Sequence, residues 1–313
     1  MQEMATREEQ EPYYVVFDIL QFTALALISA TYLSALFSQK LQRMKTWFAL
    51  MISCLLYCIS FVLLVGHQTG PSPSLDLCLF QAGLIYAAPP SVAAAGLAFV
   101  VELYLRLTTT LTQRRLDNRI ITGLLFMPPV VHQIIFWIAM FTGLPKPDIV
   151  HRNQQQMFCD ISDDIPTTVT GITVIVLIAM MILLELYTIY YLWRARSVFR
   201  DLRKRCECGP IFPFALFVRV GIFTFAGGLG IILVDILLNK SSAISSGAGT
   251  IDLLAVTKFP VPLSIALVFG TQEDIVQIYK FWKKKGPLED KSPADINIEV
   301  RGKIDDVDRS LIV

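Results

Sequence analysis

Seven stretches of about 20 or more mostly apolar residues follow one another along this 313-residue chain. About 20 apolar residues cross the hydrocarbon core of a bilayer as a helix. Only 17% of the residues are charged, against about 25% in soluble domains. The pattern predicts an all-α membrane protein, a seven-transmembrane-helix bundle, and leaves no room for a separate soluble enzyme domain. The expected helices span 14–37, 47–66, 78–105, 120–142, 166–193, 213–238 and 250–270.

Positive charge gathers on one side of these helices. The first, third and fifth loops and the adjoining tail hold 17 Lys and Arg, whereas the N-terminus and the other loops hold four. Cytosolic loops carry the excess of Lys and Arg, so we expect residues 1–13 to be an extracellular N-terminus and 14–270 the membrane domain, most simply in the plasma membrane. The tail, 286–313, mixes charges without apolar periodicity and is expected to be disordered in the cytosol. The net charge of +1 favours no nucleic-acid partner.

A short amphipathic helix is predicted at 271–285, directly after the last span. Thr271 and Asp274 fit a capping box. Apolar residues then recur at helical spacing, with lysines close by, which is typical of a helix lying on membrane lipid. The apolar residues are Ile275, Ile278, Tyr279 and Trp282.

Cysteine placement agrees with this orientation. Cys78 and Cys159 lie on the face expected to be oxidising, so we expect a disulfide between them, the alternative being two unpaired thiols. Asn239 opens a glycosylation sequon on the same face, a weak signal this close to the bilayer. Cys206 and Cys208 follow a cytosolic basic run and are either palmitoylated or plain reduced thiols.

Two segments carry a family resemblance: Cys78-Leu-Phe-Gln-Ala-Gly-Leu-Ile-Tyr-Ala-Ala-Pro-Pro and Leu267-Val-Phe-Gly-Thr-Gln-Glu-Asp274. Together with the seven helices, they make residues 14–285 resemble seven-transmembrane G protein-coupled receptors. More narrowly, the chain is similar to uncharacterised seven-helix proteins of basidiomycete fungi, which are distantly similar to fungal pheromone receptors. Glu102 and Arg106 are four residues apart, whereas rhodopsin-like receptors have an adjacent acid and arginine. The roles of the switch residues of that class are therefore not assigned to residues of this chain.

Ionisable residues inside the spans are costly and invite a functional hypothesis. Glu185 and Arg219 lie at matching depths, about 12 Å and 9 Å from the inner ends of their helices. An ion pair between them would clamp the inner side closed, or would be a purely structural pair. Lys258 on the last span can reach Asp18 or Asp235, and the three would form a polar floor beneath an outer ligand pocket. A snorkelling or structural lysine explains Lys258 equally well.

Prolines lie in pairs inside three spans, where each removes a backbone hydrogen bond and can kink its helix. Prolines are also simply commoner in membrane helices. The expected kink positions are Pro89, Pro90, Pro128, Pro129, Pro260 and Pro262.

The resemblance implies a receptor that binds an unidentified extracellular ligand and couples through helices five and six to a heterotrimeric G protein. The alternative is a small-solute transporter of three plus one plus three helices, because paired prolines recur in the third and seventh spans. A retinal protein based on Lys258 has less support, and no set of residues suggests an enzyme, a metal or a cofactor. The expected G protein contacts are Arg194, Arg196, Arg200, Arg203, Lys204 and Arg205.

Overall fold

The computed structural model describes residues 2–37, 43–68, 73–112, 117–153, 157–194, 221 and 260–270. Within α1 the side chains are described from Val15, and within α9 from Leu263. Several predictions fall outside these residues. They concern nearly all of the sixth span, the surface helix 271–285, the tail 286–313, and Arg196, Arg200, Arg203, Lys204, Arg205, Cys206, Cys208, Arg219, Asp235, Asn239 and Lys258.

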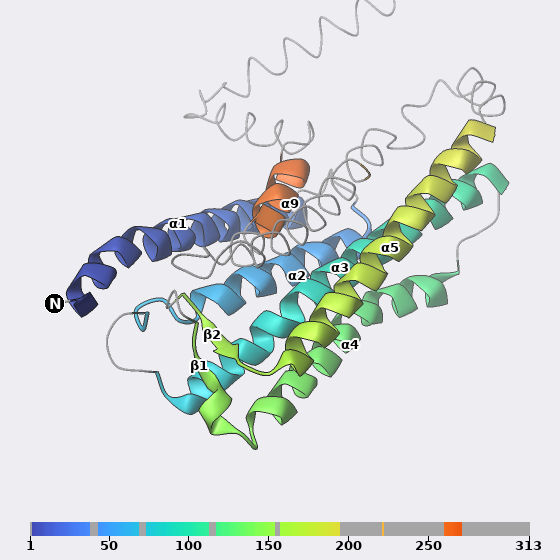
Figure 1. Ribbon diagram of the computed structural model, residues 1–313. Helices are drawn as coiled ribbons and strands as arrows, with labels where there is room; N and C mark the ends of the chain where they lie inside the picture. The colour runs from blue at the N-terminus through green and yellow to red at the C-terminus, as the bar shows by residue number, and fades with distance from the viewer. Residues whose placement is uncertain are drawn as a thin grey trace, which may run out of the picture. The chain divides into compact units, whose positions relative to one another are not determined.

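Helices account for most of the described chain (Figure 1). Five of the helices in the described part are long and apolar enough to cross a membrane, which makes the chain an integral membrane protein. They match the first five spans expected from the sequence. The elements are α1 (Gln2–Phe37), α2 (Lys45–Val62), α3 (Leu75–Thr112), α4 (Asn118–Gly143), a 3-10 turn η1 (Pro147–Ile149), β1 (Val150–Arg152), β2 (Cys159–Ile161), α5 (Asp164–Arg194) and α9 (Pro260–Gly270).

The third helix is the most enclosed of the five. It packs against α2, α4 and α5, while α1 packs against α2 and α9. Small residues on α3 permit this close approach. A Cβ at Gly83 would lie 3.0 Å from the ring of Phe136 on α4, and one at Gly96 would lie 3.4 Å from the sulfur of Met181 on α5.

We expect Gly83→Ala to destabilise the bundle by about 1–3 kcal/mol, because the added methyl overpacks the contact between α3 and α4. Gly123→Ala is the matched control, since a Cβ there has no neighbour within 4 Å. It should stabilise α4 by about 0.5–1 kcal/mol through lower chain entropy in the unfolded state. Thermal unfolding of the two purified variants should show Tm lowered by Gly83→Ala and raised by Gly123→Ala. Equal changes in Tm would contradict the close contact of α3 with α4 at Gly83.

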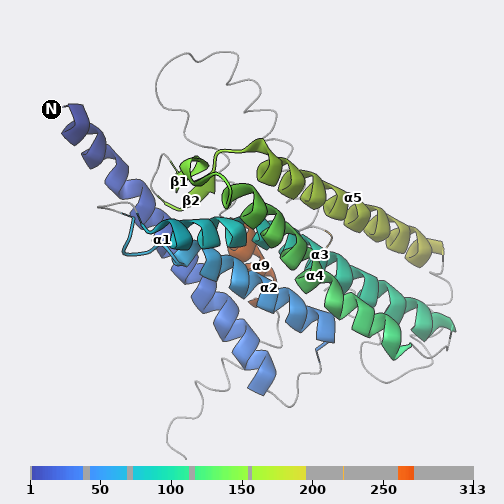
Figure 2. The ribbon, with the colours of Figure 1, turned by 90° about the horizontal axis from the view of Figure 1, so that it is seen from below.

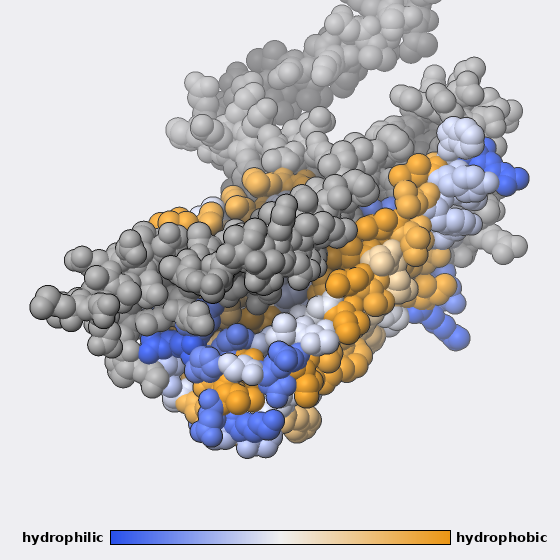
Figure 3. All heavy atoms as spheres, in the orientation of Figure 1, coloured by the Kyte–Doolittle hydropathy of each residue, from blue (hydrophilic) through white to orange (hydrophobic). Residues whose placement is uncertain are grey.

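The outward faces of α4 and α5 are apolar. Figure 3 shows apolar side chains running along α5 between hydrophilic residues near its two ends. Exposed aromatic residues lie toward both ends of the bundle, as expected of rings at the two membrane interfaces. The exposed apolar residues include Phe126, Val130, Ile134, Trp137 and Phe141 on α4, and Ile172, Ile175, Met180, Leu183, Tyr187, Tyr190 and Trp193 on α5. A face of this kind suits contact with lipid.

Two helices are longer than the sequence suggested. The apolar part of α1 starts at Val15, close to the expected residue 14, but the helix itself starts at Gln2. Glu, Gln, Met, Ala and Arg are good helix formers, so the charged residues end the apolar span without ending the helix. α3 likewise continues to Thr112 rather than 105, although four of its last seven residues are Thr, a weaker helix former. The hydroxyls of Thr108 and Thr109 donate to carbonyls of the preceding turn. Both α3 and α4 also run unbroken through their proline pairs.

A short antiparallel hairpin between α4 and α5 was not expected from the sequence. Its strands pair Val150 with Ile161 and Arg152 with Cys159. Three-residue strands carry too little alternation to be recognised. Figures 1 and 2 both place the hairpin at the end of the bundle where α1 begins.

Candidate functional site

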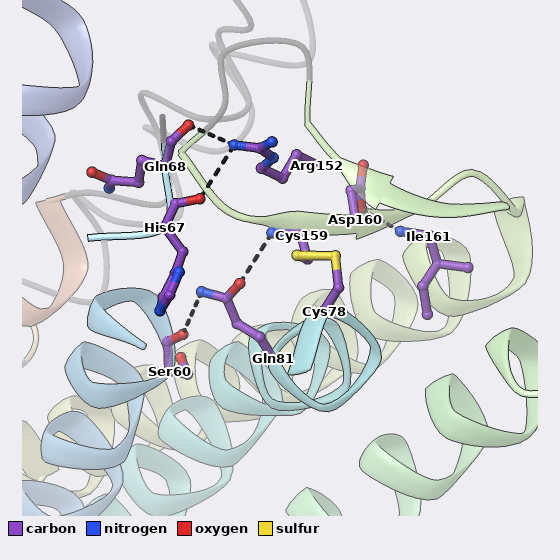
Figure 4. Close-up of a disulfide and its surroundings, with 9 residues drawn as sticks. All are labelled: Ser60, His67, Gln68, Cys78, Gln81, Arg152, Cys159, Asp160 and Ile161. Atoms are coloured by element: carbon purple, nitrogen blue, oxygen red, sulfur yellow. Dashed lines mark hydrogen bonds between the residues drawn. A yellow bond between two sulfur atoms is a disulfide. The ribbon is translucent and has the colours of Figure 1, made fainter. Parts of the chain in front are cut away.

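A disulfide joins the hairpin to the first turn of α3 (Figure 4). It links Cys78 to Cys159 across 81 residues of sequence, the pairing expected from the sequence. Both cysteines are buried. We call this end of the bundle the disulfide end.

A buried glutamine reinforces the disulfide. Gln81, one turn after Cys78, accepts a hydrogen bond from the backbone N–H of Cys159 at 3.2 Å and donates from Nε2 to the carbonyl of Ser60 on α2 at 3.2 Å. Figure 4 shows its side chain between the two elements. One amide therefore ties the hairpin, α2 and α3 together.

A second set of polar contacts holds the other side of the hairpin. The hydroxyl of Tyr86 on α3 donates to the carboxylate of Asp160, and the hydroxyl of Thr170 on α5 donates to the carbonyl of Tyr86 at 3.1 Å. From β1, Arg152 donates to the carbonyls of His67 and Gln68 at 3.2 and 2.8 Å. The hairpin is thus fixed to α3 and to the loop after α2, and α5 is fixed to α3 beside it.

Replacing Gln81 by leucine should cost about 1–3 kcal/mol of stability, because the buried N–H of Cys159 would lose its acceptor. Gln133→Leu is the control, since Gln133 is exposed on the apolar outward face of α4, and it should not destabilise the bundle. Thermal unfolding in detergent compares the two. Similar small shifts would mean that water or a backbone rearrangement replaces the bond.

The hairpin also closes the end of the bundle with apolar side chains. Met157 and Phe158, just before β2, are 5% and 3% exposed and belong to the main hydrophobic core. The ring of Phe158 meets Phe61 on α2 edge-on at 5.6 Å, and Phe61 meets Phe17 on α1 at 5.8 Å. The disulfide end is therefore filled by the hairpin's own side chains.

Of the three residues predicted to form a polar floor, the structure describes Asp18 alone. Its carboxylate accepts a hydrogen bond of 2.9 Å from Nε2 of Gln68, whose carbonyl accepts from Arg152. Asp18 thereby connects α1 to the loop that holds the hairpin. Lys258 and Asp235 lie outside the described residues, so the floor itself stays a prediction.

The opposite end of the bundle contains a buried carboxylate, and we call it the Glu102 end. Glu102 on α3 is fully buried and accepts hydrogen bonds from Oγ1 of Thr46 at 2.6 Å and from its backbone N–H at 3.3 Å. Arg106 pairs with the same carboxylate, with Nη2 2.6 Å from Oε1. A carboxylate from α3 therefore caps the N-terminus of α2, where the helix dipole favours a negative charge.

Sequence reasoning noted the Glu102–Arg106 spacing but overlooked Glu102 as a buried charge. The signal was an acid and an arginine at i and i+4 within an apolar helix. At 1.5 Å per residue, Glu102 lies about 36 Å along α3 from Cys78. A hydrocarbon core is about 30 Å thick, so the two ends are far enough apart to lie at opposite membrane interfaces.

Two further contacts surround the Glu102 end. Phe269 near the end of α9 meets Trp47 on α2 at 6.3 Å and Phe99 on α3 at 5.8 Å. Glu185 on α5 is 5% exposed, and its Oε2 lies 3.8 Å from the place that a Cβ on Gly221 would occupy. Gly221 is two residues after Arg219. The proposed partner itself lies outside the described residues.

Within the described part of the chain, no three His, Cys, Asp or Glu residues gather as a metal site. Comparison with models of protein families finds no match to this chain, and no curated protein matches it either.

Proposed function

We propose that this chain is a receptor-like signal transducer of the plasma membrane, with seven helices, an extracellular disulfide end and a cytosolic Glu102 end. An extracellular ligand acts at the first and a heterotrimeric G protein at the second. The observation that carries the proposal is that α3 connects the two ends of the bundle. One enclosed helix is bonded to the hairpin at Cys78 and holds the buried charged network at Glu102.

The charge distribution supports this orientation. The Glu102 end adjoins the loops with the excess of Lys and Arg, which marks the cytosolic side. The disulfide belongs on the oxidising side. The sixth and seventh spans and the surface helix 271–285 are part of the proposal on sequence grounds.

A transporter is less well supported. Transporters of the repeat type bind solutes where helices are broken near the bilayer midplane. Here α3 and α4 continue through Pro89–Pro90 and Pro128–Pro129. The third span, one of the two expected to be interrupted, offers no unwound backbone for a solute.

The mechanism is a shift between two states of the bundle. A ligand that prefers one position of the hairpin shifts the population toward it. The rigid attachments at Gln81, Tyr86 and the disulfide carry that displacement to α3. At the other end, α3 is bonded to the start of α2, so its movement changes the surface offered to a G protein.

Retention of nucleotide-free Gα by the purified protein in lipid nanodiscs tests the proposal without a known ligand. The control neutralises the basic run of the third cytosolic loop, Arg200, Arg203, Lys204 and Arg205. We expect retention by the native protein, release by GTP and loss in the control. Absence of retention, with solute uptake by reconstituted vesicles, would replace the receptor by the transporter.

The pair of Glu185 and Arg219 serves as an inner clamp in this proposal. Its support is that Glu185 is buried and faces the backbone at Gly221. Arg219→Ala should then raise basal GTP exchange on Gα several-fold. Unchanged exchange in a well-folded variant would make the pair structural.

A further inference from the structure

The apolar outward face of α4 contains a glutamine. Gln133 is exposed, and Phe126, Val130 and Trp137, which lie seven and three residues before it and four after it, are 63%, 50% and 51% exposed. Residues at these spacings share one face of a helix. Gln133 therefore lies among the side chains that are expected to meet lipid.

Gln133 also lies deep in the membrane. It comes 15 residues after the start of α4 at Asn118 and 10 residues before its end at Gly143. At 1.5 Å per residue, it is therefore about 15 Å or more from either end of the helix, which is about half the thickness of the hydrocarbon core. A glutamine side chain is too short to bring its amide from this depth to the membrane interface.

Within the described residues, the amide of Gln133 makes no hydrogen bond, unlike two threonines of the same helix. The hydroxyl of Thr122 donates to the carbonyl of Asn118 at 3.0 Å, and that of Thr142 donates to the carbonyl of Ile138 at 2.8 Å. These hydroxyls are satisfied by their own helix. A polar group without a partner in hydrocarbon is costly, so the amide of Gln133 needs a partner within the membrane.

Lipid does not supply that partner. Acyl chains carry no hydrogen-bond donor or acceptor, and the polar groups of lipids lie at the interfaces, outside the hydrocarbon core. The partner is therefore a protein side chain at the depth of Gln133. A second copy of this chain meets the condition without further assumption, because a two-fold axis along the membrane normal brings the same residue of both copies to the same depth.

We propose that the outward face of α4 is the interface of a homodimer, in which Gln133 pairs with Gln133 of the second copy. A primary amide both donates and accepts, so each amide donates one hydrogen bond to the other and accepts one from it. Glutamine side chains form such bonds between membrane helices. Phe126, Val130 and Trp137 pack around the pair. The inference goes beyond the proposed function, since the dimer needs neither a ligand nor a G protein.

Energy transfer between donor-labelled and acceptor-labelled copies of the full chain measures the association in liposomes at several protein-to-lipid ratios. The native protein should show more transfer than randomly placed copies. Gln133→Leu should lower the association constant about 5- to 30-fold, because two hydrogen bonds between membrane helices are lost. Transfer by the native protein at the random level, or an unchanged association constant in Gln133→Leu, would overturn the dimer.

Two variants serve as controls for the amide. Gln133→Asn keeps an amide at nearly the same depth and should reduce association less than Gln133→Leu does. Gln21→Leu removes a glutamine that is 2% exposed on α1, inside the bundle, and should leave association unchanged. Equal losses in Gln133→Asn and Gln133→Leu would overturn the amide pair, and an equal loss in Gln21→Leu would show that the effect does not come from the face of α4.

Cross-linking identifies the helix at the interface, in a chain with Cys206 and Cys208 changed to serine. Oxidation by copper phenanthroline in the membrane should link Val130→Cys into a dimer, and adding Gln133→Leu should reduce the yield. Ile175→Cys is the matched control, because Ile175 is 55% exposed on the outward face of α5, and it should give little dimer. Equal yields at the two positions would indicate random collision and overturn the interface.

Discussion

Glu102→Ala should lower the free energy of unfolding by about 2–4 kcal/mol. The carboxylate accepts from Thr46 at two donors and from Arg106, and it is fully buried. Hydrogen bonds to a charged group contribute about 1.5–3 kcal/mol each, and removing one member of a buried pair is strongly destabilising. Arg106 is half exposed and can turn toward water when Glu102 is removed. The expected loss of stability is therefore smaller than the sum of the individual hydrogen-bond contributions. Chemical denaturation in detergent measures it.

Two comparisons make this prediction specific. Asp76→Ala removes an exposed carboxylate from the first turn of the same helix and should cost at most about 1 kcal/mol. Thr46→Val should cost less than Glu102→Ala, and combining the two should add little, because both remove the same contact. Additive losses would show that Glu102 does not act through α2.

Cys78→Ser should be the other large effect. The disulfide closes a loop of about 80 residues, and losing such a bridge costs about 2–5 kcal/mol. Cys159→Ser should cause the same loss, and the double variant should be no worse than either single one. Electrophoretic mobility of the native protein should shift on reduction, and the shift should be absent from both variants.

Cys206→Ser and Cys208→Ser are the controls for that measurement. They lie far from the disulfide in sequence and should preserve the mobility shift. A native protein without any shift would show that the bridge does not form, and it would remove the attachment of the hairpin to α3 on which the receptor proposal depends.

The sequence predicted the five membrane helices that the structure describes, because such helices depend on apolar composition over some 20 residues. It placed the ends of α2, α4 and α5 within a few residues. It also paired Cys78 with Cys159, because both were expected on the extracellular side of the membrane. It misplaced the start of α1 and the end of α3, because a helix can continue beyond the apolar residues that cross the membrane.

The features of the site that the sequence did not predict depend on contacts between residues far apart in the chain. The hydrogen bonds of Glu102 to Thr46 and of Tyr86 to Asp160 join positions 56 and 74 residues apart. Neither has a local pattern. Gln133 and Phe158 look ordinary in the sequence, since only the packed structure shows that one lies on the outward face of α4 and that the other fills the end of the bundle.

The receptor proposal requires the disulfide end to face outward and the Glu102 end to face the cytosol. Single cysteines placed at the exposed Asp148 and Lys45 report on the two ends, in a chain with Cys206 and Cys208 changed to serine. In intact cells a membrane-impermeant maleimide should label Asp148→Cys, whereas Lys45→Cys should react only after permeabilisation. Labelling of Lys45→Cys in intact cells would contradict the orientation, and with it the receptor.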